Sequence, residues 1–136
     1  MSAVAGQERF FVDESALGLG KALAIARKDV IHTGHGLIPE IPLGTLDPDW
    51  MSAVAARDLI VIARDRHIRT KPVELRAYQA LGLRALWLAG KRDLSTWDYL
   101  RLVVRQWDQI EDRARTLGSG PWFVALGESG LRELTV

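Results

Sequence analysis

Apolar positions along the chain follow two periods, one typical of strands and the other of helices. Short runs of β-branched or aromatic residues predict strands, which we place at Arg9–Val12, Val30–His32, Leu59–Ala63, Ala85–Ala89, Trp122–Leu126 and Leu131–Val136. Apolar residues at every third or fourth position predict helices, which we place at Ala16–Lys28, Asp47–Asp58, Pro72–Leu81 and, as one long final helix, Ser95–Leu117. Strands and helices therefore alternate until a small terminal hairpin.

This alternation predicts an α/β protein with a mainly parallel sheet, because each parallel crossover needs a helix of about this length. The run Leu59–Ala63 is apolar throughout, as expected for a strand that is covered on both faces. A length of 136 residues with 48% hydrophobic content suits one globular domain, which we expect to span residues 1–136. Ligands of such sheets bind outside the carboxyl ends of the strands, so the residues that follow each strand are the candidates for chemistry.

Composition narrows the class of protein. The chain has no cysteine, which excludes disulfides and thiolate metal sites and fits a reducing compartment. We see no signal-peptide run at the start and no apolar stretch long enough to span a membrane, so we expect a cytoplasmic protein without membrane contact. A net charge of +1 argues against coating nucleic acid through bulk charge, but fourteen of the eighteen basic residues are arginine, which suits phosphate.

Acidic side chains stand where the predicted sheet should bind a ligand. Asp13 follows the first strand and Asp65 follows the most apolar strand, so a parallel sheet brings both to one edge, and Asp47 and Asp49 begin a helix that enters the same region. Two like charges about 4 Å apart repel by on the order of 4 kcal/mol at an effective dielectric near 20, and a cation removes this cost. Ligands that are all oxygens favour Mg²⁺ or Mn²⁺. The simpler interpretation is that each aspartate only caps a strand end or a helix.

A basic run surrounds Asp65, with Arg64, Arg66, Arg69 and Lys71 within six residues of it. These side chains are the candidates to hold phosphates beside an acid that holds metal. The alternative interpretation of such a run is a solvated surface loop.

Two other residue groups allow further interpretations. His32, His35 and Glu40 have a spacing compatible with zinc, but a fourth ligand is lacking. The five tryptophans are interpreted as core or interface residues rather than base-stacking platforms; they are Trp50, Trp87, Trp97, Trp107 and Trp122.

Three segments together resemble the compact PIN-like domain family, which includes the VapC-type toxins of toxin–antitoxin pairs. They are Phe10–Ser15, Asp47–Ala56 and Ile60–Ile68, and the continuation Arg69–Glu74 is also similar. The resemblance spans Arg9 to about Ala89. It implies a Rossmann-like, three-layer α/β/α sandwich whose acids bind Mg²⁺ or Mn²⁺ and cleave RNA.

Carried over by position, the resemblance implies catalytic roles for Asp13, for Asp47 or Asp49, and for Asp65, all of which would also bind the metal. Larger PIN domains carry an additional glutamate on a helical insertion, and a short loop replaces that insertion here. Glu14, Glu40 and Glu74 are the alternatives for this fourth acid, with Glu14 and Glu74 taken as candidate metal ligands.

Our main hypothesis is a metal-dependent endoribonuclease that hydrolyses RNA with metal-activated water and serves as the toxin of a type II toxin–antitoxin pair. An antitoxin or a second copy of the chain would contact the final helix and hairpin. A catalytically silent PIN-like scaffold is the first alternative. The second is a phosphoacceptor receiver domain using Asp13, Glu14, Asp65 and Lys91, although Ala89-Gly90 stands where its hydroxyl residue is expected.

Overall fold

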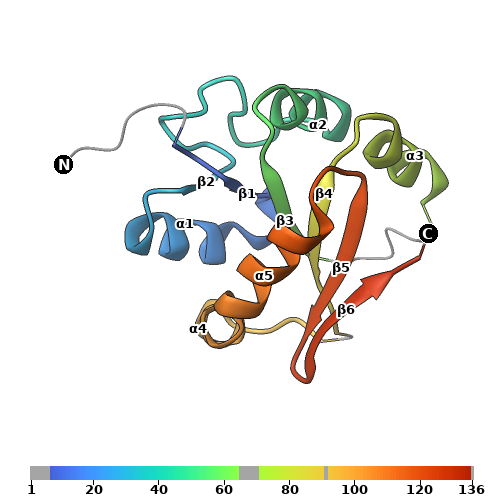
Figure 1. The fold of residues 1–136 in the computed structure, drawn as a ribbon. Coiled ribbons are helices and arrows are strands. Elements are labelled where there is room, and N and C mark those ends of the chain that lie inside the picture. The colour runs from blue at the N-terminus through green and yellow to red at the C-terminus, as the bar shows by residue number, and fades with distance from the viewer. Residues whose placement is uncertain (1–6, 65–70, 91, 136) are drawn as a thin grey trace.

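A six-stranded sheet forms the centre of the computed structural model, which describes residues 7–64, 71–90 and 92–135 (Figure 1). Its strand order is β2-β1-β3-β4-β5-β6; the first five strands are parallel, and β6 is antiparallel to β5. The strands are β1 (Phe10–Val12), β2 (Val30–His32), β3 (Ile60–Arg64), β4 (Arg84–Leu88), β5 (Trp122–Gly127) and β6 (Gly130–Leu134). The predicted parallel sheet and terminal hairpin are confirmed.

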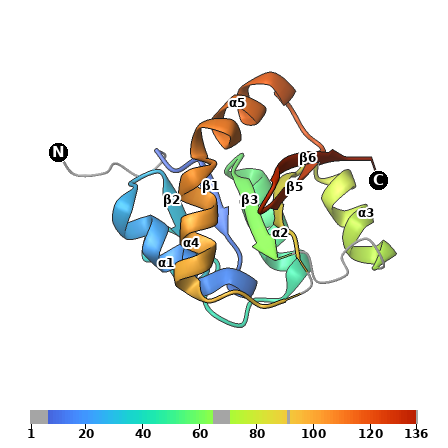
Figure 2. The same ribbon diagram turned by 90° about the horizontal axis from the view of Figure 1, so that it is seen from below.

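Helices cover both faces of this sheet (Figures 1 and 2). One layer contains the short 3₁₀ helix η1 (Glu14–Ala16) with α1 (Leu17–Ala26), α4 (Thr96–Arg105) and α5 (Trp107–Leu117), and the other contains α2 (Asp47–Ala56) and α3 (Pro72–Ala80). Successive strand residues point to opposite faces of the sheet and pack in two separate cores. Phe10 and Ile62 pack with the first layer, whereas Phe11 and Val61 pack with the second. The predicted α/β/α sandwich is therefore confirmed.

The prediction of one long final helix is wrong, because Gln106 divides this segment into α4 and α5. The Gln106 side chain is buried and its amide donates to the Gly127 carbonyl at 2.8 Å, while its backbone leaves the helical region at ψ 14°. Apolar spacing continues across the break through Val103, Trp107 and Ile110, which explains why periodicity missed it. Ser95 caps α4 by accepting from the Asp98 N–H at 3.1 Å.

Helix α1 lies very close to the sheet at Gly20. A Cβ atom there would lie 2.8 Å from the His32 Cβ and 3.0 Å from the Val12 Cβ, and both atoms are fixed to strand backbone. We predict that Gly20→Ala lowers the free energy of unfolding by about 1–3 kcal/mol, because overpacking outweighs the gain in helix propensity. Urea unfolding measures this loss.

Gly18→Ala is the matched control for Gly20→Ala on the same helix. The three atoms nearest to its Cβ would all belong to the Thr96 side chain, which can change rotamer, whereas strand Cβ atoms cannot. A smaller loss is therefore expected for Gly18→Ala, and a Gly20→Ala protein as stable as the wild type would contradict the close approach of α1.

None of the helices in the described part of the chain is long and apolar enough to cross a membrane.

Candidate functional site

The carboxyl ends of β1 and β3 form the switch point of the sheet, because the chain leaves β1 for β2 on one side and later returns to β3 on the other. Asp13 follows β1 here, and its N–H donates to the Ile62 carbonyl at 2.9 Å, which extends the pairing with β3. One oxygen of the Asp13 carboxylate accepts from the Ser15 N–H at 3.2 Å. The Ser15 hydroxyl in turn accepts from the Arg64 N–H at 3.1 Å, so η1 is tied to the end of β3.

Asp47 reaches the same switch point from the start of α2. It is the first helical residue, with Leu46 as the N-cap, so the simpler interpretation of Asp47 as a helix cap is wrong. The physical reason is that its carboxylate accepts from the indole N–H of Trp50 at 2.8 Å instead of capping the backbone. Trp50 is buried and stacks on Phe11, so Asp47 is held by a side chain that is itself fixed in the core.

Glu74, in the first turn of α3, faces Asp47 and Asp13. Its carboxyl pKa is raised by burial and then by the negative charges of Asp47 and Asp13, while Lys71 opposes these effects. The Lys71 ammonium lies 3.8 Å from the Glu74 carboxylate. Glu74 therefore interacts electrostatically with both other acidic side chains.

These acids line a pocket of about 210 Å³ at the switch point. Tyr78 and Trp50 are buried and also line it, and Lys71 and Arg64 contribute to its wall. Burial raises the Tyr78 pKa, and the charges of Asp13, Asp47 and Glu74 raise it further. The Tyr78 phenol therefore stays neutral, and the pocket combines negative carboxylates with an aromatic floor.

The other acidic candidates do not line this pocket. Asp49 is exposed on the first turn of α2, and the Glu14 carboxylate accepts from the Gly44 N–H at 2.7 Å. The Glu40 carboxylate binds the Arg57 guanidinium at 2.8 Å, which lowers the Glu40 pKa. Asp65 lies outside the described residues. Of the three alternatives for a fourth acid, the structure places only Glu74 beside Asp13 and Asp47.

Comparison with models of protein families shows to which family the chain belongs. The model of a family described as PIN like domain matches residues 9–90, which is more than half of the chain and contains Asp13, Asp47 and Glu74. The chain belongs to the PIN-like domain family. PIN-like domains are commonly nucleases, so the fold is of a nuclease type. No curated protein and no solved structure matches the chain.

The basic residues of this PIN-like domain are placed unequally around the pocket. Lys71 is at its rim with 57% of its side chain exposed. Only 11% of the Arg64 side chain is exposed, since its guanidinium pairs with Asp93 and lies over the Tyr99 ring. The structure therefore leaves more than half of the Lys71 side chain exposed and engages Arg64 within the protein. The predicted phosphate contacts Arg66 and Arg69 lie outside the described residues.

The histidines do not form a site with Glu40 in the PIN-like domain. The His32 and His35 rings are 5.1 Å apart between centroids, but the Glu40 carboxylate is bound to Arg57. Burial and then the neighbouring His32 lower the His35 pKa, and the charge of Glu8 opposes these effects only in part. Among the residues described, no three acidic or histidine side chains form a group that would hold a metal ion by themselves.

Sequence reasoning did not assign site roles to Trp50 and Tyr78. Trp50 was expected in the core and is buried there, as are Trp87 and Trp122, but its indole also orients Asp47. The spacing of Asp47 and Trp50, three residues apart on one helix, was a signal for this contact. Trp97 is not a core residue, since 65% of it is exposed at the start of α4, and its interpretation as an interface residue stays a prediction.

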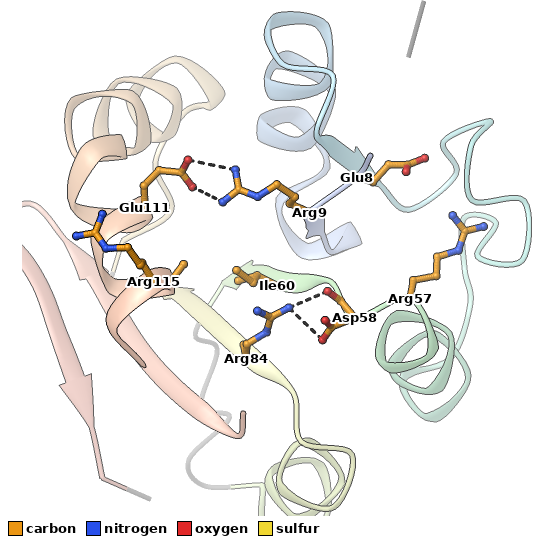
Figure 3. Close-up of a pocket in the computed structure, with 9 residues that line it drawn as sticks. Glu8, Arg9, Arg57, Asp58, Ile60, Arg84, Glu111 and Arg115 are labelled. Atoms are coloured by element: carbon orange, nitrogen blue, oxygen red, sulfur yellow. Dashed lines mark hydrogen bonds and ion pairs between the residues drawn. The ribbon is translucent and has the colours of Figure 1, made fainter. Parts of the chain in front are cut away.

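A larger cavity, of about 580 Å³, lies at the opposite edge of the sheet, where β3 and β4 begin (Figure 3). Its charged side chains already have partners: the Arg9 guanidinium donates to Glu111, and the Arg84 guanidinium donates to the backbone carbonyl and to one carboxylate oxygen of Asp58. Asp58 has a positive φ of 55°, so Arg84 stabilises a strained turn. These four charged residues of the cavity are explained by their ion pairs with one another. The switch-point pocket therefore remains the candidate site.

Proposed function

We propose that this PIN-like domain is a metal-dependent endoribonuclease that works at the pocket formed by Asp13, Asp47 and Glu74. The observation that carries the proposal is that these three carboxylates line one pocket at the switch point of a fold that is common among nucleases. Asp65 follows the end of β3 by one residue in the sequence, and we include it in the proposed acid set.

The residues of the pocket fit Mg²⁺ or Mn²⁺ by their chemistry. All available donors are oxygens, and the pKa of Glu74 is raised first by burial and then by the charges of Asp47 and Asp13, a repulsion that a cation would relieve. Mg²⁺ commonly uses one or two protein carboxylates and keeps several waters. Asp47 and Glu74 would hold the ion, with Asp13 as the third acid, so that a closed cage of protein ligands is not needed.

Each side chain then has a defined task in RNA hydrolysis. When bound, a divalent cation would offset the charge of the phosphodiester and promote deprotonation of a water. Trp50 holds the Asp47 carboxylate in one orientation, and the Ser15 N–H does the same for Asp13. Lys71 offers its ammonium to a phosphate at the rim, and the neutral Tyr78 closes the floor against bulk water.

The first test is the metal dependence of RNA cleavage by the purified wild-type chain. We expect single-stranded RNA to be cut in Mg²⁺ or Mn²⁺, and we expect EDTA to reduce the rate by about 100-fold or more, because the cation supplies several kcal/mol of charge stabilisation. RNA binding without any cleavage in either metal would instead support the alternative of a catalytically silent scaffold.

A toxin role is the narrower part of this proposal. It is supported by the resemblance of the segments around Asp13, Asp47 and Asp65 to compact toxin members, and it implies an antitoxin partner, with a homodimer as a further assembly. Arrest of bacterial growth on expression, relieved by the product of an adjacent gene, would support this role. Normal growth during expression of an RNA-cleaving protein would contradict it.

A further inference from the structure

A second pocket, of about 410 Å³, adjoins the carboxylate pocket between the first turns of α2 and α3. The two pockets share four lining residues, which are Asp47, Met51, Lys71 and Glu74. They are therefore neighbouring parts of one groove. The proposed nuclease function uses only the acidic part of this groove and gives no role to the other.

The walls of the second pocket are apolar, in contrast to those of the first. Pro48, Met51, Pro72, Val73 and Ala77 supply most of them, and the polar groups lie on the side shared with the carboxylates. Val73 is 77% exposed, so an apolar side chain faces solvent within one residue of Glu74. Pockets with apolar walls and a few polar groups at one side are typical of sites for small flat ligands.

We propose that this apolar pocket binds a nucleobase of single-stranded RNA next to the phosphate that lies at the carboxylates. The inference rests on the proposed function, because it takes RNA as the substrate of the same groove. A nucleobase is a flat ring with apolar faces, and its ribose and phosphate extend from one edge. That arrangement matches an apolar pocket whose single polar side carries Lys71 and leads to the acids.

The position of Lys71 supports this placement of the base and the phosphate. Lys71 lines both pockets and 57% of its side chain is exposed, so it lies at the junction where a backbone phosphate would pass from one pocket to the other. Along the groove, the lining side chains are thus first apolar, then the cationic Lys71, and then the carboxylates. An apolar peptide side chain would match the walls, but it would bring no anion to Lys71, which is why we favour RNA.

The test measures RNA binding and cleavage by two variants that alter the pocket in opposite ways. Val73→Ser removes apolar surface from the wall, and Ala77→Phe fills the space from the half-buried face of α3. Val104→Ser is the matched control, because Val104 is also an exposed valine, on α4 and away from both pockets. Circular dichroism melts report whether Ala77→Phe is folded, and Val73→Ser carries the test if it is not.

The ligands are a short labelled single-stranded RNA and a set of the same RNA with one abasic position each. We expect Val73→Ser to raise KM and Kd by about fivefold, the effect of about one lost methyl contact, and Ala77→Phe to raise them by about 20-fold, with smaller changes in kcat. One abasic position should weaken wild-type binding by about tenfold and should have no further effect in Ala77→Phe, as expected for two changes at one contact.

The outcomes separate this inference from the proposed function. Cleavage with an unchanged KM and an unchanged abasic penalty in both variants would overturn the base pocket and leave the nuclease intact. Base-dependent binding that the variants remove, without cleavage by the wild type, would support the pocket and overturn the nuclease. If no abasic position weakens RNA binding by the wild type, the pocket does not bind a base and the inference is wrong. A protein partner found in the pocket would overturn it in the same way.

Discussion

Asp47→Asn is expected to lower the single-turnover rate of RNA cleavage by about 100-fold or more, equivalent to about 3 kcal/mol of transition-state stabilisation. Asp47 lines both parts of the groove and faces Glu74, so its charge acts where a metal and a phosphate would meet. An asparagine keeps an oxygen that accepts from the Trp50 indole, which is 2.8 Å away. The fold should therefore survive while one negative charge is lost.

Asp49→Asn is the matched control for this prediction. It makes the same chemical change on the same first turn of α2, so both variants lose an equal favourable interaction with the helix dipole. Asp49 is exposed and does not line the pocket. We expect its rate to stay within about threefold of the wild type. Equal losses in the two variants would show that general charge at the helix start matters, and would contradict the role of Asp47.

Glu74→Gln is expected to have two opposite effects, one on stability and one on activity. The raised pKa of the Glu74 carboxyl means that its ionised form costs free energy in the folded, metal-free state, at pH values above that pKa. Removing the charge should raise the melting temperature in EDTA by about 2–4 °C, the shift that corresponds to somewhat under 1 kcal/mol in a chain of this size. Cleavage in Mg²⁺ should fall by about tenfold or more, because a metal ligand is lost.

The dependence of the melting temperature on metal concentration distinguishes the loss of a metal ligand in Glu74→Gln from a simple packing effect. Mg²⁺ or Mn²⁺ should stabilise the wild type and should stabilise Glu74→Gln much less. Glu14→Gln is the control, since its amide oxygen still accepts from the Gly44 N–H, and the residue is outside the pocket. A Glu74→Gln protein with the metal response of the wild type would refute Glu74 as the fourth acid.

The sheet could be predicted from sequence because its signals are local. Apolar runs such as Val30–His32 coincide with a strand, and Pro72 begins α3 as expected. The break at Gln106 could not be predicted in this way, since it depends on a carbonyl of β5, Gly127, twenty-one residues away in sequence. Periodicity reports which face of a helix is apolar, and it does not report where a distant group interrupts the backbone.

The candidate site was predictable in part for the same reason. Asp13 follows a clear strand, so its place at the carboxyl edge follows from the parallel topology. The choices between Asp47 and Asp49, and between Glu14 and Glu74, depend on the direction of each side chain from its helix. Those directions are set by tertiary contacts, such as the Trp50 indole on Asp47 and the Gly44 N–H on Glu14, which a single sequence does not display.

In the function that we propose, the switch-point carboxylates cleave RNA with a divalent cation. The most direct measurement is the single-turnover cleavage rate of a labelled single-stranded RNA by wild type and by Asp47→Asn, each in saturating Mg²⁺ and in EDTA. We expect rapid cleavage only by the wild type in Mg²⁺, and losses of about 100-fold or more in the other three reactions. Equal rates for wild type and Asp47→Asn in Mg²⁺ would contradict it.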